Sequence, residues 1–296
     1  MDKRKYLDPS MVAKLNNMQL RARLVVEGYM IGYHKSPYHG FSVEFAEHRS
    51  YGHGDEVRHI DWKLYGKTDR YYVKRFEEET NVRSHILLDS SQSMKFGSGS
   101  VNKLSYATYL SAALTYLMLS QKDAVGLVLF DEKIKKFIPP KSTQSHSNII
   151  MKTLEKVTPG YDTQIRPVLD SMAERIRKRG LIILISDLLD DPEKVLMGLK
   201  HFRYNKQEII VFHLMDPEEY NFDFGERIQF TDMESGESIT TDPWHIRKAY
   251  KNQIDHFNKT YQYGCRNLKI DYVPLFTNQP LDIALNEFLN KRQKLK

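Results

Sequence analysis

The sequence predicts a mostly parallel, doubly wound α/β sheet, because short apolar segments alternate with helical ones over most of the chain. Three very apolar stretches have the length of buried strands: residues 82–89, 124–130 and 181–186. Amphipathic segments of helix length separate them. Strands that alternate with helices are typical of a parallel sheet covered on both faces. We therefore expect one such sheet, preceded by an N-terminal extension.

The first part of the chain differs in kind from the rest. Residues 9–28 carry apolar side chains at helical spacing, and Ser10 is suited to cap that helix. Residues 30–80 are instead rich in Tyr, His, Gly and charge, with short strand-like runs. The sequence therefore predicts an N-terminal segment of a helix plus short strands, residues 1–80, and an α/β domain, residues 81–296.

The other elements follow the apolar pattern in chain order. Strands are expected at residues 82–89, 124–130, 134–138, 181–186, 208–214 and 269–274. Helices are expected at residues 103–121, 145–157, 165–179, 192–203 and 243–263, with a hairpin at 227–241. The strand at 134–138 ends at two prolines. Since proline lacks the N–H that an interior strand donates, this strand is expected at an edge of the sheet.

Composition and charge limit the class of protein. Of the 296 residues, 41% are hydrophobic and 28% charged, as in folded domains. A net charge of +6 favours an ordinary solvated surface over a nucleic-acid groove, and peripheral contact with an anionic membrane stays open. The single cysteine, Cys265, excludes an intrachain disulfide. Without a signal-peptide pattern or a membrane-spanning apolar run, a cytoplasmic protein is expected.

The strand at residues 82–89 ends in a motif of oxygen ligands. Asp89, Ser91 and Ser93 place one carboxylate and two hydroxyl groups at alternate positions in a short loop. Hard oxygen donors grouped this closely suit Mg²⁺, Mn²⁺ or Ca²⁺. Because such a cation takes six or more oxygens, the rest must come from other parts of the chain, from water or from a partner.

Two further donors are expected near this motif. Asp187 follows the strand at 181–186 as Asp89 follows its own strand, and ligands gather beyond the carboxyl ends of strands in an open α/β sheet. Thr163 offers a hydroxyl from the turn-forming residues 159–163. The alternative is that the motif around Asp89 caps a helix and closes a turn without any metal.

These residues resemble the metal-ion-dependent adhesion site of von Willebrand factor type A domains, which have a Rossmann-like sheet. The resemblance implies that Ser91 and Ser93 bind the cation directly. It implies that Asp89, Thr163 and Asp187 bind it directly or through water. It also implies an open coordination position that an Asp or Glu of a partner protein completes. This chain departs from the pattern at Leu188, where many members have glycine.

The N-terminal segment resembles the DUF58 family, whose members join such a segment to a von Willebrand type A-like domain. The most specific part of the match is the run of residues 54–62. With Arg49, its charged and aromatic residues form a structural motif or a partner-binding surface: Arg49, Asp55, Arg58, Asp61 and Trp62. Family members are typically encoded beside a MoxR-type AAA+ ATPase. The resemblance thus implies that ATPase, or its client, as the partner.

The sequence therefore predicts a metal-dependent protein-interaction module and not an enzyme, with no nucleic-acid partner. A haloacid-dehalogenase-type phosphatase needs a second Asp where Ser91 stands, and no G-x-S-x-G motif surrounds the serines. The histidines between His34 and His59 lack the spacing of a zinc site. Two rivals stay open: a metal-dependent phosphoester hydrolase, and a nucleic-acid or membrane-surface binder using the basic residues near 133–141 or 175–179.

Overall fold

The computed structural model describes the strands and helices of most of the chain. The described residues are 8–15, 17–33, 48–52, 60, 62–74, 82–160, 164–224, 228–231 and 238–295. The strands of the main sheet are β3 (Arg83–Asp89), β4 (Ala124–Phe130), β5 (Ile134–Lys141), β6 (Leu181–Ser186), β7 (Glu208–Met215) and β10 (Asp271–Phe276). Two small antiparallel pairs are β1 (His48–Ser50) with β2 (Tyr72–Lys74), and β8 (Ile228–Thr231) with β9 (Ser238–Thr241).

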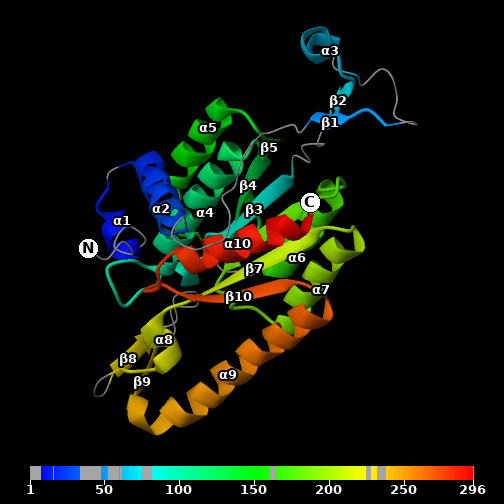
Figure 1. Cartoon of the computed structure of the whole chain (residues 1–296). Helices are drawn as coiled ribbons and strands as arrows, with labels where there is room; N and C mark the ends of the chain where they lie inside the picture. Colours follow the sequence, from blue (N-terminus) through cyan, green and yellow to red (C-terminus); the bar gives the residue numbers. More distant parts are fainter. Residues whose placement is uncertain are drawn as a thin grey trace.

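Helices cover both faces of the main sheet (Figure 1). In chain order, the helices up to residue 154 are α1 (Pro9–Ala13), α2 (Met18–Tyr33), α3 (Trp62–Thr68), the short 3-10 helix η3 (Ser93–Lys95), α4 (Lys103–Ser120) and α5 (Gln144–Leu154). The later helices are α6 (Ile165–Arg175), α7 (Pro192–Tyr204), α8 (Pro217–Asn221), α9 (Pro243–Asn267) and α10 (Asp282–Leu295).

The main sheet has six strands in the order β10-β7-β6-β3-β4-β5. All neighbouring strands are parallel except β5, which is antiparallel to β4. The predicted mostly parallel, doubly wound α/β fold is therefore confirmed. The predicted edge strand is confirmed as well, because β5 lies at the outer end of this order and continues through Pro139 and Pro140.

The central strand β3 carries the apolar run of residues 86–88, because both of its faces are buried there. Ile86 and Leu88 point into the cluster formed with α2, α4 and α10, whereas Leu87 points into the cluster formed with α6, α7 and α9. All three side chains are fully buried. Since one cluster lies on each face, the sheet is held between two layers of helices, and its carboxyl edge is a fixed platform for a site.

The N-terminal segment departs from the sequence prediction in its helices. A single helix was expected over residues 9–28, but the chain forms two, α1 and α2, with a break between them. Asp8, and not Ser10, caps the first helix, because its Oδ1 accepts the Ser10 N–H at 2.8 Å. α2 packs on α4, and the Tyr29 hydroxyl donates to Asn286 of α10 at 2.7 Å. The division of the chain at residue 80 stays a prediction.

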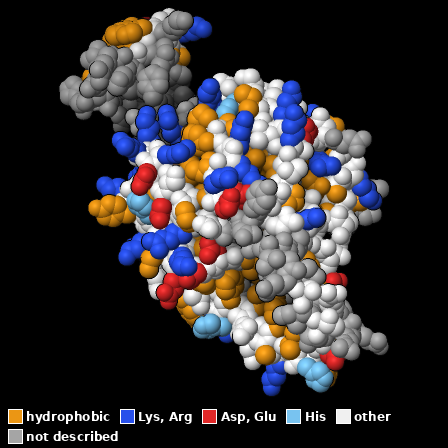
Figure 2. Space-filling view, turned by 180° about the vertical axis from the view of Figure 1, so that it is seen from behind, with side chains coloured by type: hydrophobic (Ala, Val, Ile, Leu, Met, Phe, Trp, Pro, Cys, Tyr) orange, Lys and Arg blue, Asp and Glu red, His pale blue; other side chains and the backbone are white. Residues whose placement is uncertain are grey.

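The surface and the helices bear on the predicted location. Lys and Arg side chains are spread over the face drawn in Figure 2, among apolar and acidic ones, as on an ordinary solvated surface. Within the described ranges, none of the helices combines the length and the apolar character that crossing a bilayer requires.

Stability should depend on pH through His85, a side chain of β3 that is 6% exposed. Its burial, and then the charge of Arg83, lower the pKa of His85 to about 4. Between pH 4 and the unfolded value of about 6.5, the unfolded chain binds a proton that the folded chain does not, so stability is lost as pH falls through this window. We predict that His85 contributes a loss of about 3 kcal/mol.

Urea denaturation of chelator-treated protein at pH 4 and pH 7.5 measures this loss. The variant His85→Leu removes the titrating group and should lose correspondingly less stability between the two pH values. Equal losses in the parent and the variant would mean that His85 is not the group responsible.

Candidate metal centre

The loop after β3 holds two serine hydroxyls close together beside a buried carboxylate. Asp89 is fully buried, and its Oδ1 accepts the Ser91 N–H at 2.9 Å. The Oγ atoms of Ser91 and Ser93 lie 3.0 Å apart, and both residues are buried. The intervening Ser90 points elsewhere, because its hydroxyl donates to the Phe130 carbonyl at 2.9 Å. The D-x-S-x-S motif therefore groups its three oxygen-bearing side chains as the sequence predicts.

The neighbouring strand β6 brings Asp187 to the same edge of the sheet. β3 and β6 are adjacent and parallel, so the residues at their carboxyl ends lie side by side. The Ser186 hydroxyl donates to Asp89 Oδ2 at 2.6 Å, which joins the two strand ends directly. Asp187 is 2% exposed. The predicted approach of Asp89 and Asp187 is thus present in the structure.

Leu188 stands where many von Willebrand type A domains have glycine, and its backbone adopts a conformation that glycine favours. Leu188 has φ 55°, in the left-handed region that favours glycine. Its N–H donates to the Ser186 hydroxyl at 2.9 Å, and its carbonyl accepts the Tyr261 hydroxyl at 3.0 Å. The side chain is fully buried in the cluster beneath α6 and α7. These contacts hold in a leucine the backbone conformation that glycine adopts freely.

The centre has a surplus of negative charge. Burial, and then the charge of Asp187, raise the pKa of Asp89 to about 7. Burial also raises the pKa of Glu219, a carboxylate on α8 that lies close to Asp187. A cation placed beside these buried carboxylates would favour their charged forms.

One cation is already part of the fold. The ammonium of Lys103, the first residue of α4, is fully buried and donates to Asp187 Oδ2 at 2.8 Å and to Glu219 Oε2 at 3.0 Å. Although burial opposes its charge, these two carboxylates outweigh burial and raise the pKa of Lys103. Neither Lys103 nor Glu219 is among the predicted site residues. The signal for Lys103 is a lysine within the otherwise apolar pattern of residues 103–119.

The donor set fits a hard divalent cation. Three carboxylates, on Asp89, Asp187 and Glu219, and one ammonium, on Lys103, give a net charge of −2 when Asp89 is ionised, which one divalent cation balances. The donors near the serines are all oxygens, as Mg²⁺ prefers. No group of three or more His, Cys, Asp or Glu suited to a metal occurs among the described residues. A metal here therefore needs the serine hydroxyls, with water or further ligands.

Some predicted residues lie outside the described part of the chain. These are Thr163 of the proposed centre, and Asp55, Arg58 and Asp61 of the N-terminal motif. The loop that leads to Thr163 does reach the site, since the Gly160 N–H donates to the Ser90 carbonyl at 2.7 Å.

Two residues of the N-terminal motif are described. The backbone of Arg49 pairs with that of Val73 between β1 and β2. Trp62 begins α3 and is 58% exposed, with its ring edge-on to Tyr65. An exposed tryptophan suits a partner surface better than an internal lock.

The sheet order and the two strand-end motifs define the class of protein. An open, mostly parallel sheet with a D-x-S-x-S loop after β3, and an aspartate after the adjacent β6, is a von Willebrand type A-like domain. The chain matches the family model described as "Protein of unknown function DUF58" over residues 47–260. It therefore belongs to the DUF58 family, which the sequence resemblance predicts.

The chain is also similar to a curated relative and to solved structures. The uncharacterized protein Rv1480 of Mycobacterium tuberculosis is 24% identical over 233 residues, which cover 77% of this chain and 73% of the relative. An aerotolerance-related membrane protein from Bacteroides fragilis has a TM-score of 0.50 at 19% identity, covering 71% of this chain and 99% of that chain. The SpRpn10 VWA domain has a TM-score of 0.39 at 13% identity, and the match covers 70% of this chain and 95% of that chain. The structural likenesses concern the fold.

The buried ammonium should be required for stability. We predict that Lys103→Met lowers the free energy of unfolding by about 3–5 kcal/mol, because two carboxylates lose their buried counter-charge. Urea denaturation of the chelator-treated protein measures this. The matched control is Lys95→Met in the same region, whose exposed lysine should change stability by at most about 0.5 kcal/mol. Equal stability of the two variants would contradict the ion cluster.

Proposed function

We propose that this protein is a protein-interaction module that binds its partner through a divalent cation, Mg²⁺ first among the candidates, with Mn²⁺ or Ca²⁺ as alternatives. The ligands would be the five predicted residues: Asp89, Ser91, Ser93, Thr163 and Asp187. The observation that carries the proposal is the pair of buried serine hydroxyls, 3.0 Å apart, beside carboxylates whose charge exceeds that of Lys103. Neighbouring oxygens with surplus negative charge are suited to a hard cation.

Each residue has a distinct role in this proposal. Ser91 and Ser93 would bind the cation through their hydroxyls. Asp89 accepts the Ser91 N–H and the Ser186 hydroxyl, so it fixes the loop and supplies charge at short range. Asp187 is held in place by Lys103. When bound, the cation would supply a coordination position for an Asp or Glu of the partner, and a charge-assisted bond of this kind is strong where water is excluded.

Catalysis is the less favoured function. Asp89 is fully buried and both of its oxygens already accept hydrogen bonds, so it is poorly placed to attack a substrate. Lys103 is equally committed, to Asp187 and Glu219. A metal-dependent phosphoester hydrolase would need a nucleophile or a general acid that reaches solvent beside the cation. We therefore propose a function in binding and not in turnover.

The proposed partner is a MoxR-type AAA+ ATPase or a client that this ATPase matures, and the proposed location is the cytoplasm. Membership of the DUF58 family supports this, because members are typically encoded beside such an ATPase. The exposed Trp62 on α3 would offer a second contact surface for such a partner. Metal and partner would then act together, with the carboxylate of the partner completing the coordination.

Calorimetric titration of the chelator-treated protein with Mg²⁺ and Mn²⁺ tests the metal site. We predict saturable binding in the parent and its loss in the double variant Ser91→Ala/Ser93→Ala, which removes both hydroxyl ligands. The matched control is Ser90→Ala in the same loop, which should bind as the parent does because its hydroxyl donates to Phe130. At a concentration 100 times the dissociation constant, the metal should raise stability by about 2.7 kcal/mol in the parent.

Other outcomes would revise the proposal in defined ways. Equal binding in the parent and the double variant would place the metal elsewhere. If a folded parent binds no metal alone, capture of the purified ATPase with and without chelator decides whether the partner completes the site. Capture that is unaffected by chelator would end the proposal of a metal-bridged contact.

A further inference from the structure

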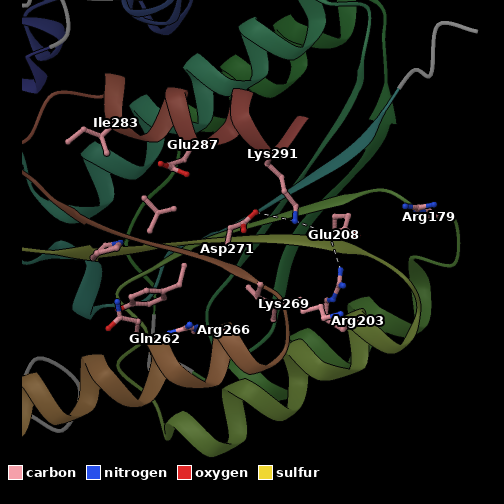
Figure 3. A pocket seen from close by; sticks show the side chains of 14 residues that line it. Arg179, Arg203, Glu208, Gln262, Arg266, Lys269, Asp271, Ile283, Glu287 and Lys291 are labelled. Carbon is pink, nitrogen blue, oxygen red and sulfur yellow. Dashed lines mark ion pairs between the residues drawn. The ribbon is translucent and has the colours of Figure 1, made fainter. Parts of the chain in front are cut away.

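A second surface lies at the opposite end of the sheet from the candidate metal centre. The strands β6, β7 and β10 are parallel neighbours, so their amino ends lie together. At these ends an open groove of about 850 Å³ runs along the edge strand β10. Figure 3 shows α10 on one side of it and α9 on the other. The groove uses no residue of the metal centre.

The side chains that line this groove carry a surplus of positive charge. Three are carboxylates (Glu208, Asp271 and Glu287) and five are cations (Arg179, Arg203, Arg266, Lys269 and Lys291). Glu208 accepts from Arg203 at 3.0 Å and from Lys291 at 2.8 Å, and Lys291 also contacts Asp271 at 3.1 Å. Although partial burial opposes it, these two cations lower the pKa of Glu208. Arg203 and Lys291 are therefore already neutralised within the groove.

Three cations are left over. Arg179, Arg266 and Lys269 are exposed and make no ion pair with any residue that the structure describes. Arg179 lies in the loop that leads into β6, Arg266 in the last turn of α9, and Lys269 in the loop that leads into β10. Hydrogen bonds from the buried Gln207 side chain fix the loop that carries Arg179. Gln207 Nε2 donates to the carbonyls of Ile176 (3.2 Å) and Lys178 (2.9 Å). At least one of these charges thus projects from a fixed backbone.

The edge strand is blocked against pairing with another strand. The Thr277 N–H donates to the Met215 carbonyl of β7 at 3.1 Å. Because main-chain N–H groups alternate in direction along a strand, those at positions 272, 274 and 276 face away from β7. Pro274 has no N–H, and the Phe276 N–H donates to Gln279 Oε1 at 3.1 Å. An added strand would find few donors here, so recognition falls to side chains.

We propose that this groove binds an acidic, extended segment of a partner protein through Arg179, Arg266 and Lys269. Charge complementarity carries the choice of occupant, since the uncommitted groups are three cations against the single carboxylate of Glu287. A concave groove suits a peptide better than a flat bilayer. Single-stranded nucleic acid is less suited because its bases need exposed aromatic rings. Among the described residues that line the groove, the only aromatic one is Tyr272, whose hydroxyl lies 2.6 Å from His213 Nδ1.

The protein and a fluorescein-labelled polyglutamate peptide of about eight residues test the proposal by fluorescence anisotropy at an ionic strength of about 0.1 M, with chelator present. The parent should bind, and the variant Arg179→Glu/Arg266→Glu/Lys269→Glu should bind at least tenfold more weakly. The matched control reverses three exposed lysines on β5 and its turn, Lys133→Glu/Lys136→Glu/Lys141→Glu, with the same change in net charge. It should bind within about threefold of the parent, since exposed charges farther away than about 10 Å are screened.

Several outcomes would overturn the proposal. Equal weakening in the groove variant and the β5 variant would mean that net charge, and not the groove, attracts the peptide. Tighter binding of an oligothymidylate or of phosphatidylserine vesicles, lost in the groove variant, would assign the surface to nucleic acid or membrane.

Circular dichroism checks that each variant is folded. If the triple variant fails to fold, Arg266→Glu alone should still weaken peptide binding at least threefold. Ser91→Ala/Ser93→Ala should bind the peptide as the parent does.

Discussion

The ion cluster of Lys103, Asp187 and Glu219 is the interaction on which the carboxyl edge of the sheet depends. It joins the start of α4, the end of β6 and the helix α8 at distances of 2.8 and 3.0 Å. Glu219 also completes the capping box of α8, together with Asp216. Because two carboxylates buried without a counter-charge would destabilise the fold, the ammonium keeps this edge formed whether or not a metal is bound. The proposed divalent cation would then bind to a carboxyl edge that is already formed.

The two ends of the sheet have opposite character. Carboxylates gather at the carboxyl ends of β3 and β6, and uncommitted cations border the amino ends of β6 and β10. In a parallel sheet these ends are separated by the length of the strands, so two partners, or two parts of one partner, would not compete for space. The proposed adaptor between an ATPase and its client would need two separate surfaces of this kind.

Buried strands and short-range motifs are the features that sequence predicts best here. Both faces of β3, β4 and β6 meet helices, so nearly every residue of β4 and β6, and residues 86–88 of β3, are apolar and the pattern is clear. The D-x-S-x-S loop is equally readable because its donors are two residues apart. Lys103 and Glu219 are 116 residues apart, and nothing in either local pattern indicates their pairing. The groove is harder still, since it exists only once residues from two loops, two strands and three helices come together. The break between α1 and α2 does have a local signal, because Asn17 Oδ1 accepts the Gln19 N–H at 2.7 Å, as the capping residue of a new helix does.

The left-handed backbone at Leu188 has a consequence for the thermodynamics of association. A glycine would allow the loop after β6 many conformations. The buried leucine side chain, the hydrogen bond that the Leu188 N–H donates to Ser186 and the one that its carbonyl accepts from Tyr261 restrict it. Association loses conformational entropy wherever a surface must become ordered on contact. In this loop the order is established during folding. A partner that docks beside Asp187 would therefore cost the loop little conformational entropy, and more of the contact energy would remain as affinity.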